Sequence, residues 1–413
     1  MFGKLSLERA PGGGRGHCKT MVINGSGEEA AFAYTQHDIT GHRPALWTRN
    51  QAFQGLTRQQ AVLSSSPMQL RITGRLIIHP KWCLRGGAMR VFIGVDVGAT
   101  KTQTLAVNDA GDVLGMATQG PGATYTVGYD AFAEVVDAGI SEVLRHASAT
   151  KADVVAAGLG VSGYDWPSNL PPTLEALGHL GLSGALAVHN DGDLPLAAGT
   201  SESWGVAVSA GTGNIVTGMD SQGRYARSTG GSMWAGELGG AMELVYIAVQ
   251  AVAHEYLRRG SPTRISGLMV AATGSRDILD LLERIAEGHL RVPPGFAQQI
   301  IEAALEGDAV ANDLLWRSGR DLGLTTVGII RQLDFQTKPF EIVLSGSMFR
   351  QMAPCFVDPL KEAIMAEAPG AQFTRLETIP VVGGVILAMK KAGFDFRPCR
   401  NKIIQGVRAL ATG

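Results

Sequence analysis

The stretch of sequence that decides the fold is VFIGVDVGATKTQT, residues 91–104. An apolar, β-rich run delivers one acid, Asp96, and a small-residue turn with Thr hydroxyls then leads into the apolar run 105–107. This pattern predicts a β-hairpin whose bend presents backbone N–H groups and hydroxyls to an anion, beside a carboxylate. It is not a Walker A loop, because the GxxxxGK[ST] spacing is absent and no helix is expected directly after it. A plain turn between strands is the alternative interpretation of this segment taken alone.

Composition is typical of an ordinary soluble globular protein. Hydrophobic residues make up 45% of the 413 residues and charged residues 18%, which is enough for two lobes with cores of their own. No apolar run approaches the roughly 20 residues that span a membrane, so no membrane association is expected. The cysteines are scattered without a CxxC pair, which favours a reducing cytoplasm. They are Cys18, Cys83, Cys355 and Cys399.

The first part of the chain differs in charge from the rest. Residues 1–90 hold 12 Lys and Arg against 4 Asp and Glu, whereas the remainder holds 24 against 33. This part lacks sustained periodicity and carries loop-like runs at 11–16 and 64–67. We interpret residues 1–88 as a disordered or spurious N-terminal extension. A targeting peptide is disfavoured by Glu28, Glu29 and Asp38, and composition favours a solvated tail over a nucleic-acid arm.

From residue 90 the sequence alternates between strand and helix patterns, and the pattern restarts near residue 204. Strands are predicted at 91–96, 103–108, 112–118, 154–160, 185–189, 204–210, 214–219, 224–228, 340–345 and 371–375. Helices are predicted at 130–148, 172–180, 193–201, 241–258, 276–287, 296–306, 309–333, 348–367 and 382–392. Two halves that each open with three strands predict an α/β protein with a cleft between two lobes, 89–202 and 203–395, and a C-terminal tail at 396–413.

Four bends at predicted strand ends carry glycines or acids, which is where ligands gather in α/β sheets. The bends are 96–102, GLGVSGYD at 158–165, HNDGD at 189–193 and SAGTGN at 209–214. Each is a common turn by itself. Their order in two matching halves indicates one site shared by both lobes.

With these motifs, residues 90–395 resemble the BadF/BadG/BcrA/BcrD-type ATPase family and, within it, the N-acetylglucosamine and glucosamine kinases of the actin, heat-shock chaperone and sugar kinase superfamily. The matching stretches are GVDVGATKT (94–102), GVSGYD (160–165), NDGD (190–193), SAGTGN (209–214), GGSMWAGELGG (230–240), LSGSMF (344–349) and PVVGGVILA (380–388). The resemblance implies a two-lobed, actin-like (ribonuclease H-like) fold. It also implies a cytoplasmic, ATP-dependent sugar kinase that needs Mg²⁺, acts on a small-molecule sugar without nucleic acid or membrane, and can form a homodimer.

The resemblance also implies roles for individual residues. Asp165 would be the general base, and Asp96 and Asp191 would organise Mg²⁺. ATP would be held by Gly98, Ala99, Thr100, Thr102, Gly211, Thr212, Gly213, Asn214, Gly346 and Ser347. The sugar would be held by Ser162, Gly163, Asn190, Asp191 and Glu237. One position departs from the family pattern, because Ala123 stands where many relatives carry an Asn that contacts the sugar, and this change puts N-acetylglucosamine itself in question.

Phosphoryl transfer agrees with these assignments, because it needs positioning, charge neutralisation and a carboxylate that accepts the proton of the attacking hydroxyl. The plainer interpretations are a turn aspartate for Asp165 and a helix-start residue for Glu237. Two other functions stay open. An activator ATPase with an iron–sulfur cluster would need clustered thiolates, and a sugar sensor would need a helix-turn-helix, which residues 1–88 do not predict.

Overall fold

The computed structural model describes residues 3–6, 17–24, 31–38 and 89–412. The chain divides into two units, Met1–Trp82 and Cys83–Gly413. In the first unit, three strands pair antiparallel in the order β1-β2-β3, namely β1 (Gly3–Ser6), β2 (His17–Asn24) and β3 (Ala31–Asp38). The rest of segment 1–88 lies outside the described residues, so its interpretation as an extension stays a prediction.

The second unit begins with a five-stranded sheet in the order β6-β5-β4-β7-β8. Its strands are β4 (Val91–Val97), β5 (Thr102–Asn108), β6 (Val113–Gln119), β7 (Val154–Val161) and β8 (Ala185–Asn190). The three strands β4, β5 and β6 pair antiparallel, while β7 pairs parallel to β4 and β8 pairs parallel to β7. The carboxyl ends of β4, β7 and β8 therefore meet at one edge of the sheet, where three of the four predicted bends lie.

A second five-stranded sheet repeats this arrangement in the order β11-β10-β9-β12-β13. Its strands are β9 (Gly205–Ala210), β10 (Asn214–Met219), β11 (Tyr225–Arg227), β12 (Phe340–Ser345) and β13 (Ala371–Arg375). Again the first three strands, β9, β10 and β11, pair antiparallel, while β12 pairs parallel to β9 and β13 pairs parallel to β12. Every predicted strand after residue 90 is present with its ends within one residue, and the predicted two-lobed α/β fold is confirmed.

Both faces of the first sheet are covered, which explains why its central strands β4 and β7 are apolar at every position except Asp96. Val91, Ile93 and Val95 pack in one core with α1 (Thr124–His146). The other face packs with α3 (Asp193–Gly199) and α11 (Val381–Lys391). The backbone of α11 comes so close to β7 that a Cβ added at Gly158 would lie 2.1 Å from the carbonyl oxygen of Gly384.

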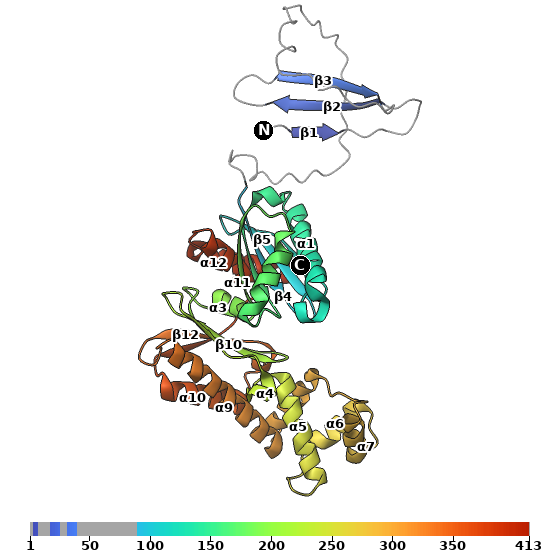
Figure 1. The fold of residues 1–413 in the computed structure, drawn as a ribbon, viewed down its shortest axis with the longest axis vertical. Coiled ribbons are helices and arrows are strands. Elements are labelled where there is room, and N and C mark those ends of the chain that lie inside the picture. Colours follow the sequence, from blue (N-terminus) through green and yellow to red (C-terminus); the bar gives the residue numbers. More distant parts are fainter. Residues whose placement is uncertain (1–2, 7–16, 25–30, 39–88, 413) are drawn as a thin grey trace, which may run out of the picture. The chain divides into compact units, whose positions relative to one another are not determined.

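The end of the chain returns to the first lobe, which differs from the predicted boundary at residue 395. Figure 1 shows α11 and α12 beside β4 and β5, rather than beside β12. The predicted tail 396–413 is the helix α12 (Arg397–Thr412), and its Ile403 and Val407 are buried in the core under the first sheet. Residues four apart lie on the same face of a helix, so this narrow apolar stripe is enough to dock α12.

The second lobe carries most of the helices of the described residues. These second-lobe helices are α4 (Ser232–Ala235), α5 (Ala241–Tyr256), α6 (Arg264–Thr273), α7 (Ile278–Ala286), α8 (Ala297–Leu305), α9 (Ala309–Gln332) and α10 (Pro354–Glu367). The first lobe also contains α2 (Leu170–Gly178). Short 3₁₀ turns occupy Lys151–Asp153, Pro167–Asn169, Pro294–Phe296 and Ser347–Phe349. The helices α4 and α6 were not predicted. The predicted helix 348–367 begins instead at Pro354, because proline is favoured in the first helical turn.

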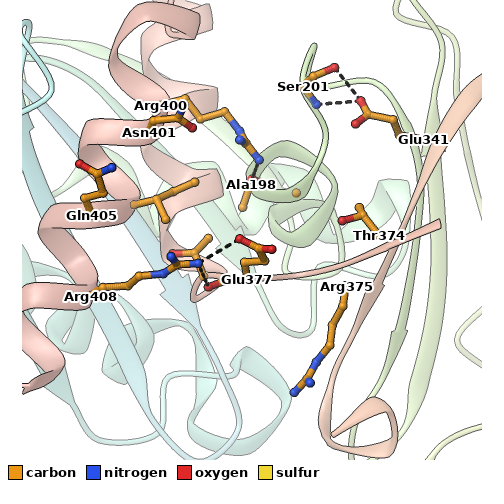
Figure 2. Close-up of a pocket in the computed structure, with 13 residues that line it drawn as sticks. Ala198, Ser201, Glu341, Thr374, Arg375, Glu377, Arg400, Asn401, Gln405 and Arg408 are labelled. Atoms are coloured by element: carbon orange, nitrogen blue, oxygen red, sulfur yellow. Dashed lines mark hydrogen bonds and ion pairs between the residues drawn. The ribbon is translucent and has the colours of Figure 1, made fainter. Parts of the chain in front are cut away.

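Two stretches of chain, 200–204 and 376–380, connect the lobes. Residues of both connections line the same pocket beside α12, namely Ser201 of the first and Glu377 and Thr378 of the second. Figure 2 shows this pocket. Among the described helices, none has the length and apolar character needed to cross a membrane.

Candidate active site

The loop after β7 places Asp165 at the edge of the first sheet. Gly163 has a φ of +96°, a backbone conformation that glycine adopts without a steric penalty. Beyond it, the side-chain oxygen of Asn169 accepts hydrogen bonds from the backbone N–H of Asp165 (3.2 Å) and of Trp166 (2.8 Å). The backbone at Asp165 and Trp166 is therefore held by the side chain of Asn169.

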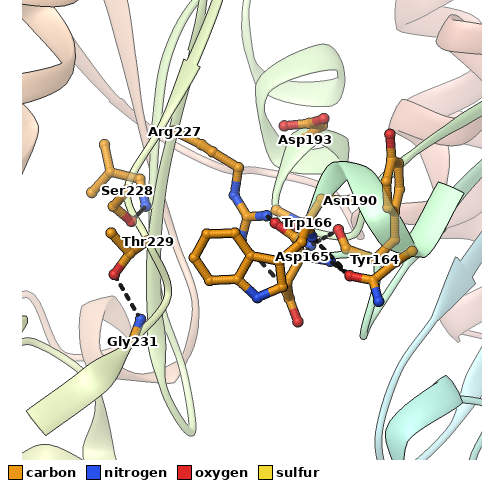
Figure 3. A network of polar contacts seen from close by, with 12 residues as sticks. Tyr164, Asp165, Trp166, Asn190, Asp193, Arg227, Ser228, Thr229 and Gly231 are labelled. Carbon is orange, nitrogen blue, oxygen red and sulfur yellow. Dashed lines mark hydrogen bonds and ion pairs between the residues drawn. The ribbon is translucent and has the colours of Figure 1, made fainter. Parts of the chain in front are cut away.

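The carboxylate of Asp165 is held by one donor from each lobe, as Figure 3 shows. Asn190, at the end of β8, donates from Nδ2 to Asp165 Oδ1 (3.2 Å) and to the carbonyl oxygen of Tyr164 (3.0 Å). Arg227, at the end of β11 in the second lobe, forms an ion pair with Asp165 Oδ1 at 3.2 Å. Its Nη1 also donates to the carbonyl oxygen of Asp165. The direction of this carboxylate is thus set by both lobes.

Asp165 lies in the wall of a pocket of about 600 Å³ between the lobes, which we call the cleft pocket. Its walls are Tyr164, Asp165, Trp166, Pro167, Leu170, Val188, His189, Asn190, Asp193, Met219, Tyr225, Arg227, Ser228 and Thr229. Trp166 and Tyr225 are 49% and 43% exposed. The hydroxyl of Tyr225 donates a hydrogen bond to Asp193 (3.0 Å). Burial, and then the charge of Asp193, raise the pKa of Tyr225. Aromatic walls with a few directed polar groups are typical of a small-molecule site.

Three acids gather where β4, β7 and β8 end. Burial, and then the charge of Asp191, raise the pKa of Asp96 to about 7, while Lys101 opposes the shift. Burial and the charge of Asp165 raise the pKa of Asp191 to about 6, while a hydrogen bond from Ser162 opposes the shift. The structure therefore brings Asp96, Asp165 and Asp191 close enough for their charges to interact, as the sequence predicts.

The hairpin turn between β4 and β5 is closed by its own backbone. The N–H of Gly98 donates to the carbonyl oxygen of Lys101 (3.0 Å), and the carbonyl oxygen of Gly98 accepts from Gly122 (3.1 Å). Ala99 and Thr100 are exposed at the tip of the turn. Thr102 is buried, and its hydroxyl has no hydrogen-bond partner among the described residues.

The matching turn of the second lobe lies on the N-terminal end of α5. The first N–H groups of this helix, those of Ala241 and Met242, donate to the carbonyl oxygens of Gly211 (2.9 Å) and Thr212 (2.8 Å). Thr212 and Gly213 are exposed, whereas the side-chain oxygen of Asn214 is buried without a partner in the described part of the chain. The predicted phosphate-binding turn is therefore fixed in place, with its exposed tip open to a ligand.

Gly346 and Ser347 come next to this turn because β12 pairs parallel with β9. Gly346 has a φ of +102°, and a Cβ at this position would lie 2.2 Å from the carbonyl oxygen of Ala210. Both residues are exposed. The two second-lobe segments predicted to hold the nucleotide thus lie side by side.

Glu237 serves the backbone of a neighbouring loop. Its carboxylate accepts from the N–H of Thr229 (2.8 Å), the hydroxyl of Thr229 (3.0 Å) and the N–H of Gly231 (3.0 Å). Glu237 is buried, and Thr229 is the member of this group that lines the cleft pocket. In this structure Glu237 therefore acts on the pocket through the loop 229–231.

Ala123 lies beside the loop that carries Asp165. It is fully buried, and the N–H of the next residue, Thr124, donates to the carbonyl oxygen of Ser162 (3.3 Å). The Asn that the family pattern predicts at position 123 would therefore stand next to the loop predicted to hold the sugar, which includes Ser162.

Sequence reasoning did not find Arg227, Trp166 or Tyr225. Arg227 and Tyr225 lie on a three-residue edge strand without a motif, and only the fold brings them across the cleft. An aromatic residue directly after Asp165 was a usable signal for Trp166, because large exposed aromatic side chains often mark ligand sites.

Comparisons with known proteins agree with this architecture. Residues 93–388 match the model of the BadF/BadG/BcrA/BcrD ATPase family. An N-acetylmuramic acid/N-acetylglucosamine kinase of Clostridium acetobutylicum is 24% identical over 302 residues, covering 73% of this chain and 98% of that protein. An N-acetyl-D-glucosamine kinase of Dictyostelium discoideum is 26% identical over 321 residues, covering 72% and 98%.

Among solved structures, one described as a candidate N-acetylglucosamine kinase from Chromobacterium violaceum superposes with a TM-score of 0.57 at 22% identity. The match covers 73% of this chain and 99% of that one, and it shows a shared fold. The family match covers most of the chain, both lobes included. The chain therefore belongs to the BadF/BadG/BcrA/BcrD ATPase family.

Proposed function

We propose that this protein is a kinase that transfers the γ-phosphoryl group of ATP to a hydroxyl of an amino sugar. The observation that carries the proposal is the Asp165 carboxylate, which faces a pocket between the lobes and is held by donors from both. The relatives named as amino-sugar kinases support it, because the chain covers nearly their full length. An aromatic pocket of about 600 Å³ is large enough for one sugar ring.

Asp165 acts as the general base in this proposal. Its carboxylate accepts the proton of the acceptor hydroxyl while that oxygen bonds to the γ-phosphorus, and the bond from phosphorus to the bridging oxygen of ADP breaks. Asn190 and Arg227 keep the carboxylate aimed at the acceptor. Positioning of this kind supplies a large part of catalysis when the transferred group needs little covalent help.

The glycine turns supply the phosphate contacts. The exposed tips at residues 99–100 and 212–213 are small enough for backbone N–H groups to approach phosphate oxygens. The side-chain oxygen of Asn214, which has no partner among the described residues, lies on the same side of the second lobe as the exposed pair Gly346 and Ser347. We assign these second-lobe groups to the nucleotide.

Asp96 and Asp191 fit Mg²⁺. Burial and mutual repulsion raise the pKa of Asp96, and a divalent cation would remove that repulsion. Mg²⁺ in phosphoryl-transfer sites is commonly held by one or two carboxylates together with water and phosphate oxygens. When bound, the ion neutralises charge on the phosphates.

The test is the near-isosteric substitution Asp165→Asn, assayed by ADP release with glucosamine, N-acetylglucosamine and N-acetylmuramic acid as acceptors. We expect kcat to fall by roughly 10²–10⁴, the usual contribution of a positioned base, while ATP binding stays unchanged. Asp109→Asn is the matched control, because Asp109 is exposed in the turn between β5 and β6. An Asp165→Asn variant that keeps near-normal kcat would refute the assigned role, and no ADP release with any amino sugar would refute the substrate class.

A further inference from the structure

A second pocket, of about 320 Å³, lies at the junction of the lobes and shares no residue with the cleft pocket. We call it the hinge pocket. Its walls come from the two connections (Ser201, Glu377), from α12 of the first lobe (Arg400, Gln405) and from β12 and β13 of the second lobe (Glu341, Thr374), as Figure 2 shows. Its volume falls within the range of small-molecule sites.

The acids of the hinge pocket already have donors. Glu341 accepts from the N–H (2.8 Å) and the hydroxyl (2.7 Å) of Ser201. Glu377 forms an ion pair with Arg408 at 3.0 Å. Each of these two carboxylates therefore already accepts a hydrogen bond or pairs with a cation within the chain.

The donors are less well satisfied than the acids. Arg400 donates from Nη2 to the carbonyl oxygen of Ala198 (2.7 Å), but its Nε is buried without an acceptor among the described residues. The hydroxyl of Thr378 is buried and equally unpartnered within that part of the chain. A buried donor without a partner is costly, and native structures supply one from a ligand or water.

We propose that the hinge pocket binds a phosphate monoester, a small phosphorylated metabolite whose presence biases the angle between the lobes. Phosphate oxygens suit a guanidinium group, because its N–H groups match them in charge and geometry. The amides of Asn401 and Gln405 line the same pocket and can bind hydroxyls of the ester. Arg375 stands at the rim, and its side chain extends away from Arg400 in Figure 2.

The position of the hinge pocket allows a bound ligand to influence the cleft pocket through the angle between the lobes. Both connections between the lobes contribute to its wall, and so do elements of each lobe. Rotation of the lobes must therefore change the shape of the pocket. A ligand that fits one arrangement better shifts the equilibrium toward it, and by reciprocity nucleotide binding changes the affinity for that ligand by the same factor.

The test is binding to the full chain measured by calorimetry, with the nucleotide site filled by a non-hydrolysable ATP analogue. Glucose 6-phosphate, inorganic phosphate and glucose are the three probes. We expect glucose 6-phosphate to bind and glucose to give no such signal. Arg400→Gln should weaken binding roughly tenfold or more, the loss expected for one charge-assisted hydrogen bond. Thr378→Val, which keeps the side-chain shape, should weaken it by a smaller factor.

Lys402→Gln is the matched control, because it removes a positive charge from the same helix at a residue paired with Asp112 (2.7 Å) outside the pocket. Equal affinity for inorganic phosphate would support the site with free phosphate as its ligand. Absence of binding to the unaltered chain, or unchanged affinity in both the Arg400 and Thr378 variants, would overturn the proposal. So would binding that is lost in Arg227→Gln but kept in Arg400→Gln, since the probe would then occupy the cleft.

The bias on the lobe angle has its own readout, which needs no turnover. Affinity for the ATP analogue is measured with and without saturating glucose 6-phosphate, in the unaltered chain and in Arg400→Gln. We expect a change in the unaltered chain that disappears in the variant. The same affinity with and without the ester would overturn the coupling, whatever the kinase assays give.

Discussion

Replacing Arg227 by Gln is expected to lower kcat by about 10–100-fold with a small effect on stability. The guanidinium makes two contacts with Asp165, one to its carboxylate at 3.2 Å and one to its carbonyl oxygen. The Asp165 side chain is 42% exposed, so solvent screens the ion pair and its loss should cost about 1 kcal/mol or less of folding free energy. Catalysis is more sensitive, because a displacement of about 1 Å in a reacting group can cost about 10²-fold in rate. The assay is coupled ADP release at saturating ATP and acceptor, together with a thermal unfolding curve.

Arg224→Gln is the control for this prediction. Arg224 lies just before β11 and pairs with Asp220 (2.6 Å) and Asp334 (2.9 Å), away from the cleft pocket. Its loss removes the same charge from the same region, and kcat should stay within twofold of the unaltered chain. A normal kcat in Arg227→Gln would show that Asp165 does not need the second lobe for its position. An equal fall in both variants would show that only net charge matters.

Two further predictions concern stability. Asp308 caps α9 by accepting from the N–H of Ala311 (2.8 Å), so Asp308→Ala should cost about 1–2 kcal/mol in urea unfolding at pH 7. Burial raises the pKa of Asp308, but the backbone N–H donors outweigh this and hold the pKa below its usual value. The stability lost in the variant should therefore shrink as the pH falls below about 4, where the carboxylate becomes protonated. A loss of stability that is the same at every pH would contradict the cap. Gly158→Ala places a Cβ 2.1 Å from the carbonyl oxygen of Gly384 and should destabilise by about 1–3 kcal/mol or more, whereas Gly328→Ala in α9 meets nothing within 4 Å and should stabilise slightly. Equal unfolding midpoints for the two glycine variants would contradict that packing.

The strands and the repeat could be predicted from the sequence because their signals are local. A run such as residues 91–97 is apolar except for Asp96, and a small-residue turn marks its end, so the ends of the strands were predicted within one residue. The assignment of helices to lobes is not local. Residues 381–391 follow the second sheet in sequence but pack on the first, because Gly384 lets the backbone approach β7 and Gly383 lets it approach Leu194 of α3. The sequence of a single helix does not predict which of two sheets the helix will cover.

The same reasoning separates the parts of the candidate site. The bends with Asp96, Asp165 and Asp191 could be grouped in advance, since parallel strands bring their carboxyl ends to one edge. Arg227 could not, because its place depends on how the second lobe faces the first. Glu237 was assigned to the sugar from a family motif, while its carboxylate is engaged by the backbone of loop 229–231. A motif fixes which residue is present, and only the fold shows which partner that residue has.

The ion pair between Arg227 and Asp165 makes the position of the proposed base depend on the angle between the lobes. Asp165 follows β7 of the first lobe, and Arg227 ends β11 of the second. Any rotation about the connections 200–204 and 376–380 that separates the lobes must lengthen the contact between guanidinium and carboxylate. The base would then lose one of its two side-chain donors and keep only Asn190 from its own lobe. A ligand bound at the connections could therefore change the rate of phosphoryl transfer without touching the substrate, since it would change how often the base is held in place.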